Sequence, residues 1–491
     1  MNHQGNPFNE GSTSPATRVQ PNNRHRQVIS LQIHGLLPSF SLQEELAPLI
    51  VAMDSRTPFT MILLVLSLLA CAAGLEDGDG LLGASFLFGD SLVDAGNNNY
   101  LTTLSRANLP PNGIDFKPSG GQPTGRFTNG RTIGDIIGEQ LGQPNYALPF
   151  LSPNATGPVI LNGVNYASGG GGILNQTGRL FVGRIGMDVQ VDFFNVTRKQ
   201  VDQLLGPAKA KNYIMKDSIF SVTIGSNDFL NNYLLPVVSV AERLVYTPNQ
   251  FTDSMITNLR SQLTVILSLT RSLILFKTAF KSYSSLGFHV KRSFQNESEQ
   301  HLNGQKVGKA SKQTELTGHV DRRCLNYRGQ NLTRLYTLDA RKFVVANVGP
   351  LGCIPYQKSL SGLDEKECAE LPNQVVTQYN GKLKDLLAEL NDNLPGASFC
   401  LANVYDLVME LISNYPKYGF DTASQACCGS GGQYRGLIPC GPATSLCEDH
   451  SKHVFWDPYH PSEAANIILA RELVHGDKYI SPMNLYTLRH L

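Results

Sequence analysis

The chain has 491 residues, of which 41% are hydrophobic and 16% are charged, and its formal net charge at pH 7 is +1. This length fits one large domain with a substantial core or two smaller domains, and the near-zero charge gives no overall reason to expect binding to nucleic acid or to a membrane surface. The 45 glycines and 27 prolines predict many tight turns between short elements, which argues against a helical bundle or a disordered chain.

A segment near the amino terminus has the build of a secretory signal peptide. Residues 53–74 combine a basic start, an apolar run and an Ala-x-Ala pattern at residues 70–72. The apolar run is too short for a membrane span. Because a signal peptide begins a chain, we expect Met53 to be the true start and residues 1–52 to be a non-native or disordered extension; a poorly functioning internal anchor is the alternative.

The cysteines indicate an oxidising compartment. Apart from Cys71, there are eight, and most lie in loop-like sequence rich in Gly and Pro, where disulfides commonly brace a secreted domain. The pairing cannot be derived from their spacing. Acceptor motifs for N-glycosylation, which are consistent with secretion, start at Asn154, Asn175, Asn195, Asn296 and Asn331.

Short apolar runs alternate with longer segments of helical periodicity. The expected strands are residues 83–88, 158–166, 218–224, 342–348 and 397–404, and the expected helices include residues 131–141, 251–264, 374–393, 404–414 and 462–474. This alternation predicts a central parallel sheet of about five strands covered by helices on both faces. We therefore expect one three-layer α/β/α domain over residues 75–491.

One segment, residues 265–333, interrupts this order. From Val265 to Leu332 it carries eleven Lys or Arg and only four Asp or Glu. Joining Thr264 directly to Arg334 restores the apolar helical stripe, so the segment looks inserted into a helix. Its first residue is Val, whose codons begin with GT, which is compatible with a retained intron. The alternative is a basic interaction arm, although solvated or disordered charged tracts are more common.

The stretch FLFGDSLVDAGNNNYL, residues 86–101, sets Gly89, Asp90 and Ser91 directly after an apolar run. By itself this is typical of a turn or a helix cap. If residues 83–88 form a parallel strand, Ser91 lies just past its carboxyl end, the edge at which open α/β sheets bind ligands. A serine at that edge fits a nucleophile, which then requires a histidine base, a group that orients the base, and donors for an oxyanion.

The stretch VFWDPYHPSEAAN supplies a candidate base and orienting group. Asp457 and His460 are three residues apart, and Pro458 and Pro461 restrict the loop before the expected helix. His460 would take the Ser91 proton while Asp457 holds the imidazole. Taken alone, an Asp-Pro before a helix is ordinary capping and a single histidine is more often structural.

Two glycine- and asparagine-containing segments could supply the oxyanion donors. GVNYASGGGGIL, residues 163–174, can bring backbone amides close to a ligand, and VTIGSNDFLNNY, residues 222–233, puts Asn227 just beyond an expected strand. Glycine runs alone usually mark turns. A phosphate-binding loop is excluded because neither segment ends in Gly-Lys-Ser/Thr.

Six blocks of this sequence resemble, in their order, the plant GDSL-motif esterase/lipase family of the SGNH hydrolase superfamily. The blocks are FGDSLVDAGNNNYL, GRFTNGRTIGDIIGEQLG, GVNYASGGGGIL, IGSNDFLNNY, VVANVGPLGCIP and VFWDPYHPSEAAN. The resemblance covers residues from about 80 to 264 and from 334 to 491. It implies a flavodoxin-like α/β/α fold, secretion to the cell wall or apoplast, and cofactor-free hydrolysis of lipid or acylated-carbohydrate esters. The extension and the insert depart from the family's pattern.

The same resemblance implies site residues. Ser91, His460 and Asp457 would be catalytic, and the Ser91 N–H, Asn227 and one glycine of the four-glycine run would bind the oxyanion. We take this glycine to be Gly172, with Gly169 or Gly170 as alternatives. The same triad also serves acyl transfer to an alcohol, so a transferase remains an alternative, as does a non-catalytic product inactivated by the insert.

Other partners are disfavoured. Zinc sites use cysteine and histidine ligands, which this chain offers in Cys440, Cys447, His450 and His453. The cysteines of a secreted chain, however, more often pair with each other. Nothing resembles a nucleic-acid-binding module, and no membrane span is expected in the mature form. We therefore expect no metal and no cofactor, and an ester carried by a small molecule or a polymer as the substrate.

Overall fold

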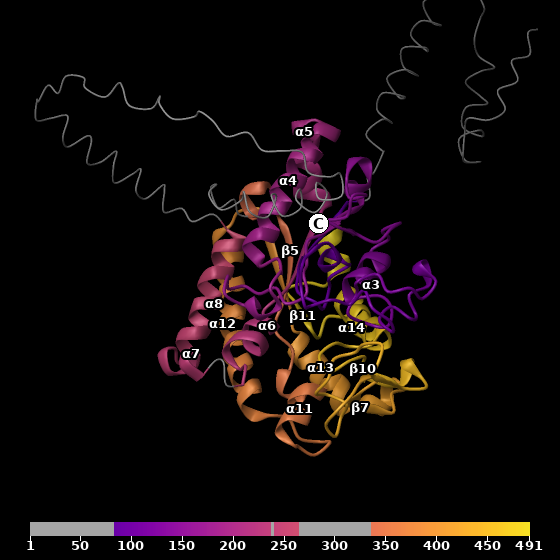
Figure 1. Cartoon of the computed structure of the whole chain (residues 1–491). Helices are drawn as coiled ribbons and strands as arrows, with labels where there is room; N and C mark the ends of the chain where they lie inside the picture. Colours follow the sequence, from indigo (N-terminus) through magenta and orange to yellow (C-terminus); the bar gives the residue numbers. More distant parts are fainter. Residues whose placement is uncertain (1–82, 237–239, 265–334) are drawn as a thin grey trace, which may run out of the picture. The chain divides into compact units, whose positions relative to one another are not determined.

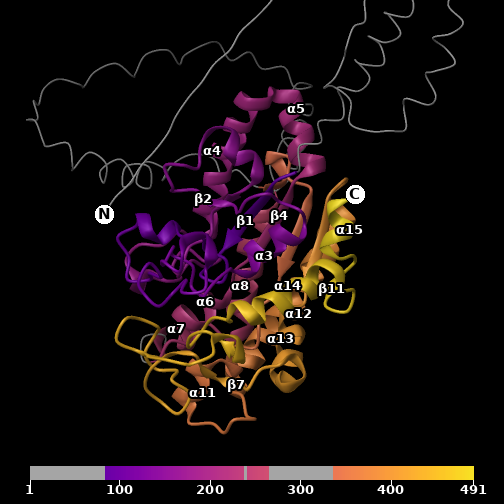
Figure 2. The same ribbon diagram turned by 90° about the vertical axis from the view of Figure 1, so that its right-hand side faces the viewer.

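The computed structural model describes residues 83–236, 240–264 and 335–491, and all of its described elements belong to the compact unit Asp79–Leu491. The expected extension at residues 1–52, the signal-like segment at 53–74 and the insert at 265–333 lie outside the described residues. The described parts of the chain form an α/β fold around one mostly parallel sheet (Figures 1 and 2).

The central sheet has seven strands in the order β11-β6-β5-β4-β1-β3-β2. The strands are β1 (Ser85–Gly89), β2 (Leu148–Pro149), β3 (Val164–Asn165), β4 (Ile219–Thr223), β5 (Lys342–Ala346), β6 (Ser398–Ala402) and β11 (Ile480–Ser481). All neighbours pair in parallel except β11 with β6. The five expected strands are β1, β3, β4, β5 and β6, and their spatial order is the 2-1-3-4-5 arrangement of flavodoxin-like folds.

The expected strand at residues 158–166 is mostly wrong. A 3-10 helix, η4 (Gly157–Asn162), occupies most of the range, and only Val164–Asn165 are extended. Pro158 lies in the first turn of η4, where its missing N–H is tolerated. Gly163 follows with φ of 112°, and a Cβ there would lie 2.2 Å from the Ser85 carbonyl oxygen, so β3 reaches β1 through a position open only to glycine.

The expected helices are present with small changes in their bounds. They are α3 (Ile133–Gln140), α8 (Pro248–Leu263), α12 (Glu370–Asn393), α13 (Val404–Ser413) and α14 (Glu463–His475). The structure adds α4 (Met187–Leu205), α5 (Pro207–Asn212), α6 (Ser226–Asp228), α7 (Val240–Val245), α11 (Pro355–Ser361) and α15 (Leu485–Arg489). Side chains define several starts: Thr132 and Thr247 form capping boxes at α3 and α8, and Ser462 caps α14.

The two faces of the sheet are packed differently. On one face Phe86, Phe220, Phe343 and Phe399 form a ladder across four strands, with ring centroids 4.4–5.6 Å apart, and Phe194 of α4 packs against it. Helices α8 and α12 lie on one side of the sheet and α3 and α14 on the other (Figure 1). The expected three-layer arrangement is therefore confirmed.

Two small sheets and two disulfides support the segment that follows β6. Strand β7 (Thr422–Ala426) pairs in parallel with β10 (His453–Phe455), and β8 (Cys428–Gly429) pairs with β9 (Ser445–Leu446). The disulfides there join Cys427 to Cys447 and Cys428 to Cys440, and a third joins Cys353 to Cys368. Cys400, on β6, is buried with a free thiol.

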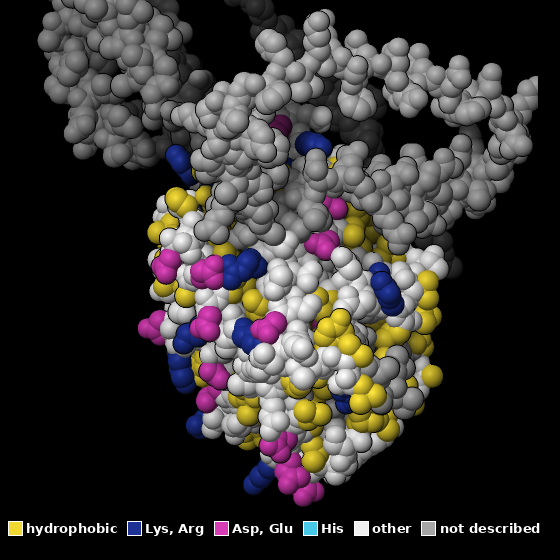
Figure 3. Space-filling model, turned by 90° about the vertical axis from the view of Figure 1, so that its left-hand side faces the viewer, with side chains coloured by type: hydrophobic (Ala, Val, Ile, Leu, Met, Phe, Trp, Pro, Cys, Tyr) yellow, Lys and Arg dark blue, Asp and Glu magenta, His cyan; other side chains and the backbone are white. Residues whose placement is uncertain are grey.

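The surface over α7, α8 and α12 mixes charges of both signs. Figure 3 shows acidic and basic side chains close together on this face, without a large patch of one sign among its described residues. Ion pairs of this kind connect α8 to α12, from Arg260 to Glu389 and from Asp253 to Lys382. No helix in the described ranges is long and apolar enough to cross a membrane.

Candidate active site

Three strand ends bring the candidate residues together. Ser91 follows β1, the glycine run follows β3, and Asn227 lies in α6, directly after β4. Because these strands are parallel neighbours in the sheet, their carboxyl ends meet at one edge, where the strand order reverses. Ser91, Asn227, Asp457 and His460 line one cavity of about 420 Å³ at this edge.

Ser91, His460 and Asp457 form a continuous hydrogen-bonded chain. His460 Nε2 lies 2.7 Å from Ser91 Oγ, and His460 Nδ1 lies 2.8 Å from both carboxylate oxygens of Asp457. An ionised carboxylate can only accept, so Nδ1 carries the proton and Nε2 is the acceptor that faces the Ser91 hydroxyl. His460 and Asp457 are buried, whereas Ser91 is partly exposed to the cavity.

The loop from Trp456 to His460 is closed on itself. The Trp456 N–H donates to the His460 carbonyl at 2.8 Å, and Asp457 Oδ1 accepts the N–H groups of Tyr459 and His460, each at 2.8 Å. Asp457 therefore holds both the backbone and the imidazole of His460. Pro458 lies in this loop and Pro461 follows it, in agreement with the expectation that prolines restrict the backbone here. Ser462 comes directly after Pro461 and caps α14.

The Asn227 side chain is oriented by two hydrogen bonds. Its Nδ2 donates to the Gly171 carbonyl at 3.0 Å, and its Oδ1 accepts from Asn231 Nδ2 at 2.5 Å. One hydrogen of the Asn227 amide therefore has no partner among the described residues, and Asn227 lines the cavity.

The glycine run presents Gly170, and not Gly172, to the cavity. The Gly169 N–H donates to Asp94 at 3.0 Å and the Gly171 N–H donates to the Ser168 carbonyl at 2.9 Å. Gly170 lines the cavity with φ of +81°, and within the described ranges its N–H donates to no other residue.

The structure places Gly172, the glycine expected to bind the oxyanion, away from the cavity. The Gly172 carbonyl accepts the Met187 N–H at 3.0 Å. A Cβ at Gly172 would meet Thr177 and Asp228, so this glycine faces packed side chains. Four adjacent glycines have the same local chemistry, and only the path of the loop separates them.

Asp228, which no sequence pattern indicated, shapes the glycine run. Its two carboxylate oxygens accept the N–H groups of Ile173 and Leu174, each at 2.9 Å, and the Thr177 hydroxyl at 2.7 Å. Burial raises the pKa of Asp228 to about 6, against the lowering effect of these donors. The only sequence feature that could have identified Asp228 is its position next to Asn227.

Asp90, beside the nucleophile, was also missed. It is buried at the cavity wall; its Oδ1 accepts the Leu92 N–H at 3.1 Å, whereas its Oδ2 has no hydrogen-bond partner among the described residues. Burial raises the pKa of Asp90 to about 7, partly offset by the Leu92 N–H and by His460. Burial likewise raises the pKa of Asp94 to about 6.

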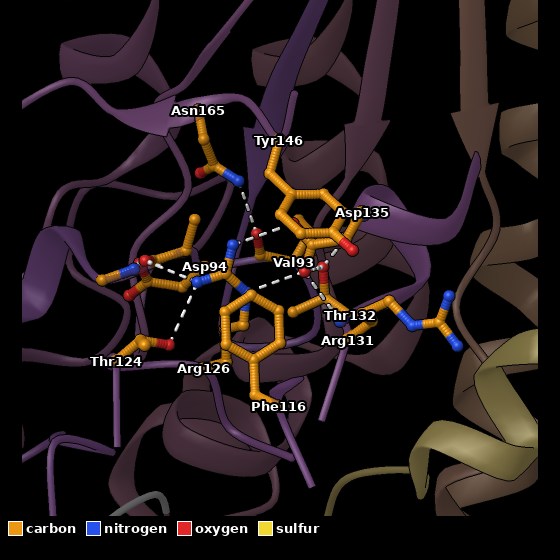
Figure 4. A network of polar contacts seen from close by, with 12 residues as sticks. Val93, Asp94, Phe116, Thr124, Arg126, Arg131, Thr132, Asp135, Tyr146 and Asn165 are labelled. Atoms are coloured by element: carbon orange, nitrogen blue, oxygen red, sulfur yellow. Dashed lines mark hydrogen bonds and ion pairs between the residues drawn. The ribbon is translucent and has the colours of Figure 1, made fainter. Parts of the chain in front are cut away.

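A buried ion pair supports the segment after Ser91. Arg126 donates through Nε and Nη2 to both oxygens of Asp135 at 2.8 and 2.9 Å, and its guanidinium lies beside the rings of Phe116 and Tyr146 (Figure 4). Asn165 of β3 donates to the Val93 carbonyl at 2.7 Å. Arg126 also donates through Nη1 to the Ala95 carbonyl at 3.4 Å, so these contacts connect the chain that leaves the nucleophile to α3 and β3.

The described residues do not fit a structural zinc site. Cys427, Cys447 and His453 have ligand atoms within 4.8 Å of one another, but the two cysteines are joined in a disulfide and offer no thiolates. Cys440 is likewise paired, and His450 Nδ1 lies 2.8 Å from a carboxylate oxygen of Asp115.

The comparisons with known proteins agree with this fold. A family model described as GDSL-like Lipase/Acylhydrolase matches residues 86–305 and 313–473. A GDSL esterase/lipase of Arabidopsis thaliana is 56% identical over 436 residues, which are 88% of this chain and 95% of the relative. A second from the same plant is 54% identical over 412 residues, 84% and 92% of the two chains, and a third is 43% identical over 434 residues, 87% and 96%.

At the carboxyl edge of this flavodoxin-like sheet, a serine, a histidine and a carboxylate meet. This arrangement is typical of a hydrolase in which a histidine activates a serine hydroxyl. The chain belongs to the GDSL lipase/acylhydrolase family and is a carboxylic ester hydrolase. The resemblance noted in the sequence is thereby confirmed.

Proposed function

We propose that this protein cleaves esters through an acyl-enzyme, with Ser91 as nucleophile, His460 as general base and acid, and Asp457 as the group that orients the imidazole. The observation that carries the proposal is the chain of hydrogen bonds from Ser91 Oγ through His460 to Asp457, at 2.7 and 2.8 Å. All three side chains face the same cavity, which is large enough for a small substrate.

In the first half of the reaction, Ser91 Oγ attacks the ester carbonyl carbon while its proton passes to His460 Nε2. The tetrahedral intermediate collapses, the bond to the alcohol breaks, and the alcohol leaves with that proton. In the second half, His460 takes a proton from water, whose oxygen attacks the acyl carbon, and the acid leaves as Ser91 regains its proton. Asp457 stabilises the imidazolium that forms in each half.

The oxyanion of each intermediate would be bound by Asn227 Nδ2 and by the N–H groups of Ser91 and Gly170. Two observations favour Gly170 over Gly172: it lines the cavity, and its N–H is free of partners within the described ranges. Each donor of this kind contributes about 2.7–4 kcal/mol to the transition state in known enzymes.

We also propose that the protein is secreted. Three disulfides among the described residues favour an oxidising compartment, and the acceptor residues Asn154 and Asn175 are exposed. Residues 53–74 would act as the signal peptide, with Met53 as the start, and residues 265–333 would be dispensable for the domain over residues 75–491. Recovery of glycosylated protein from the medium of cells expressing it from Met53 would test the first point.

The experiment that tests the catalytic proposal is hydrolysis of p-nitrophenyl esters by the wild-type protein, by Ser91→Ala and by a form lacking residues 265–333. A matched control is Ser152→Ala, a serine outside the cavity lining. We expect activity in the wild type and in Ser152→Ala, and none above background in Ser91→Ala. Full activity of Ser91→Ala would refute the assignment, and activity only in the deleted form would support inactivation by the insert.

A further inference from the structure

The cavity does not stop at the candidate catalytic residues but continues down one face of the central sheet. We propose that this continuation, called here the lower arm, binds the acyl chain of a medium- or long-chain fatty ester. The lower arm is lined by Ser221, Val344, Ala402, Val408, Leu469 and Leu473. The inference rests on the proposed function, because the acyl carbonyl must lie at Ser91.

The depth of the lower arm follows from the positions of its lining residues in the strands. Ser221 of β4 and Val344 of β5 are direct neighbours in the sheet, and each lies two residues before the end of its strand. At about 3.3 Å per residue, the cavity therefore reaches about 7 Å below the strand ends. Ser221 is partly exposed although β4 is in the middle of the sheet, because its side chain faces this space.

Helix α14 gives a second measure of the same depth. Asn466, Leu469 and Leu473 line the cavity from successive turns of this helix, whose start follows His460 closely. From Asn466 to Leu473 the helix rises by about 10 Å at 1.5 Å per residue. The lower arm therefore leads from the catalytic level into the layer between the sheet and the helix.

The lower arm exists because the two faces of the sheet carry side chains of different size. The face toward α4 carries the phenylalanine ladder, with Phe220, Phe343 and Phe399. The face toward α14 carries the smaller Ser221, Val344 and Ala402. Since protein interiors are normally filled to crystal-like density and cavities destabilise the fold, a space of this kind is best explained by a ligand that fills it.

The chemistry of the lining selects an apolar occupant. Among the described residues that line the cavity, the charged ones are Asp90, Arg106 and Asp457, and none of them belongs to the lower arm. Its one polar side chain is the Ser221 hydroxyl. A sugar ring would bury several hydroxyl groups there without enough partners, whereas an alkyl chain needs none. The alcohol part would then lie toward solvent beside Arg106 and Leu180, which line the cavity and are exposed.

The test combines binding with chain-length selectivity. Binding of dodecanoate to Ser91→Ala is measured by calorimetry, and kcat/KM is measured for p-nitrophenyl acetate, octanoate and dodecanoate. Ser221→Leu fills the lower arm from the sheet and Leu473→Phe fills it from α14, so that one variant remains if the other does not fold. Ile467→Phe is the matched control, since it adds bulk to the exposed side of the same helix.

We expect the octanoate or dodecanoate ester to be preferred over the acetate, and either filling variant to lower that preference by at least about tenfold, because each methylene excluded from an apolar site loses its transfer free energy. Both filling variants should also abolish dodecanoate binding when combined with Ser91→Ala, and Ile467→Phe should change neither result.

The outcomes separate the two proposals. Ser91-dependent hydrolysis with a preference that neither filling variant alters, together with no dodecanoate binding, would overturn the lower arm and leave the catalytic proposal standing. Absence of hydrolysis in both the wild type and the form lacking residues 265–333, with dodecanoate binding that the filling variants remove, would support the lower arm and refute the catalytic proposal. Absence of binding, and of hydrolysis in both of these forms, would overturn both proposals.

Discussion

Gln190 hydrogen-bonds both backbone groups of Gly89. Its Oε1 accepts the Gly89 N–H and its Nε2 donates to the Gly89 carbonyl, each at 2.8 Å, and Nε2 also donates to the Ile185 carbonyl at 2.8 Å. Gln190 belongs to α4 and is fully buried, and Gly89 is the last residue of β1, two residues before Ser91. The strand end that presents the nucleophile is therefore held by a side chain from a distant helix.

Replacing Gln190 by Leu should impair both stability and catalysis. The change leaves the Gly89 N–H buried without a partner, at about 1–3 kcal/mol, and it removes one donor from the Gly89 carbonyl, which keeps the Ser168 N–H at 3.2 Å. Because the turn that carries Ser91 also loses its support, we expect kcat to fall more than KM changes. Urea unfolding and ester kinetics measure the two effects.

The matched control for this prediction is Gln143→Leu. Gln143 is a buried glutamine that donates to the Gly83 carbonyl at 3.0 Å, just before the other end of β1. We expect Gln143→Leu to lower stability while kcat remains close to the wild-type value. Equal losses of kcat in the two variants would argue against a positioning role for Gln190.

Replacing Asp457 by Asn should abolish most of the esterase activity without unfolding the protein. The amide keeps the size of the side chain, but it is neutral, so it is a weaker acceptor for His460 Nδ1–H and cannot stabilise the imidazolium. In a serine protease the corresponding change lowers kcat by about 10⁴. Steady-state kinetics and a thermal melt test this. Asp449→Asn, an exposed carboxylate in the same segment, should retain activity; a mild effect of Asp457→Asn would contradict the proposed role.

Replacing Asn227 by Ala removes a proposed oxyanion donor. We expect kcat to fall by about 10²–10³ with little change in KM, because the interaction forms chiefly in the transition state. The neighbouring Asn232→Ala, which loses only a long contact of 3.4 Å to the Thr177 hydroxyl, is the control. A rise in KM at constant kcat would indicate substrate binding and not oxyanion stabilisation.

Asp90→Asn should flatten the pH dependence of stability. Burial raises the pKa of Asp90 to about 7, so between about pH 4 and 7 the folded state holds a proton that the unfolded state has lost. The free energy of unfolding therefore decreases as the pH rises through this window, by about 1.4 kcal/mol per pH unit for this group. The same sign applies to Asp94 and Asp228, whose pKa values are raised to about 6.

Urea unfolding of the wild type and of Asp90→Asn between pH 4 and 8 measures this effect. We expect a smaller decrease with rising pH in the variant, and a wild-type slope in Asp392→Asn, whose side chain is exposed on α12. A wild-type slope in Asp90→Asn would show that Asp90 titrates at its ordinary value.

The disulfide between Cys427 and Cys447 should stabilise the loop that carries Asp457 and His460. It closes a segment of 20 residues, and the Cys427 N–H donates to the Phe455 carbonyl at 3.1 Å. Removing both cysteines should lower the free energy of unfolding by about 3 kcal/mol. Activity should also be lost at a lower temperature than in the wild type. Cys400→Ala, which removes a free thiol, serves as the control, and an unchanged melting temperature in the double variant would contradict the prediction.

Much of the fold could be predicted from local patterns. Strands β1, β4, β5 and β6 and the five expected helices lie within a few residues of their predicted bounds, because apolar runs and helical periodicity depend on neighbours along the chain. The prediction for residues 158–166 was wrong where Pro158 favours a 3-10 turn. Helix α4 was not predicted, although it carries Gln190.

The sequence by itself determined the family and the order of the elements, since six ordered blocks are highly specific and the blocks with Ser91, Asn227 and His460 can be placed at strand or helix ends. Only the tertiary structure decided which groups meet: Ser91 and His460 are 369 residues apart yet 2.7 Å from each other. It also brought Gly170, and not Gly172, to the cavity, and it showed the contacts of Asp90, Asp228 and Gln190 and how far the cavity extends along the sheet. Contacts between distant segments and the volumes left between packed layers depend on how the whole core is filled, and local sequence patterns do not encode them.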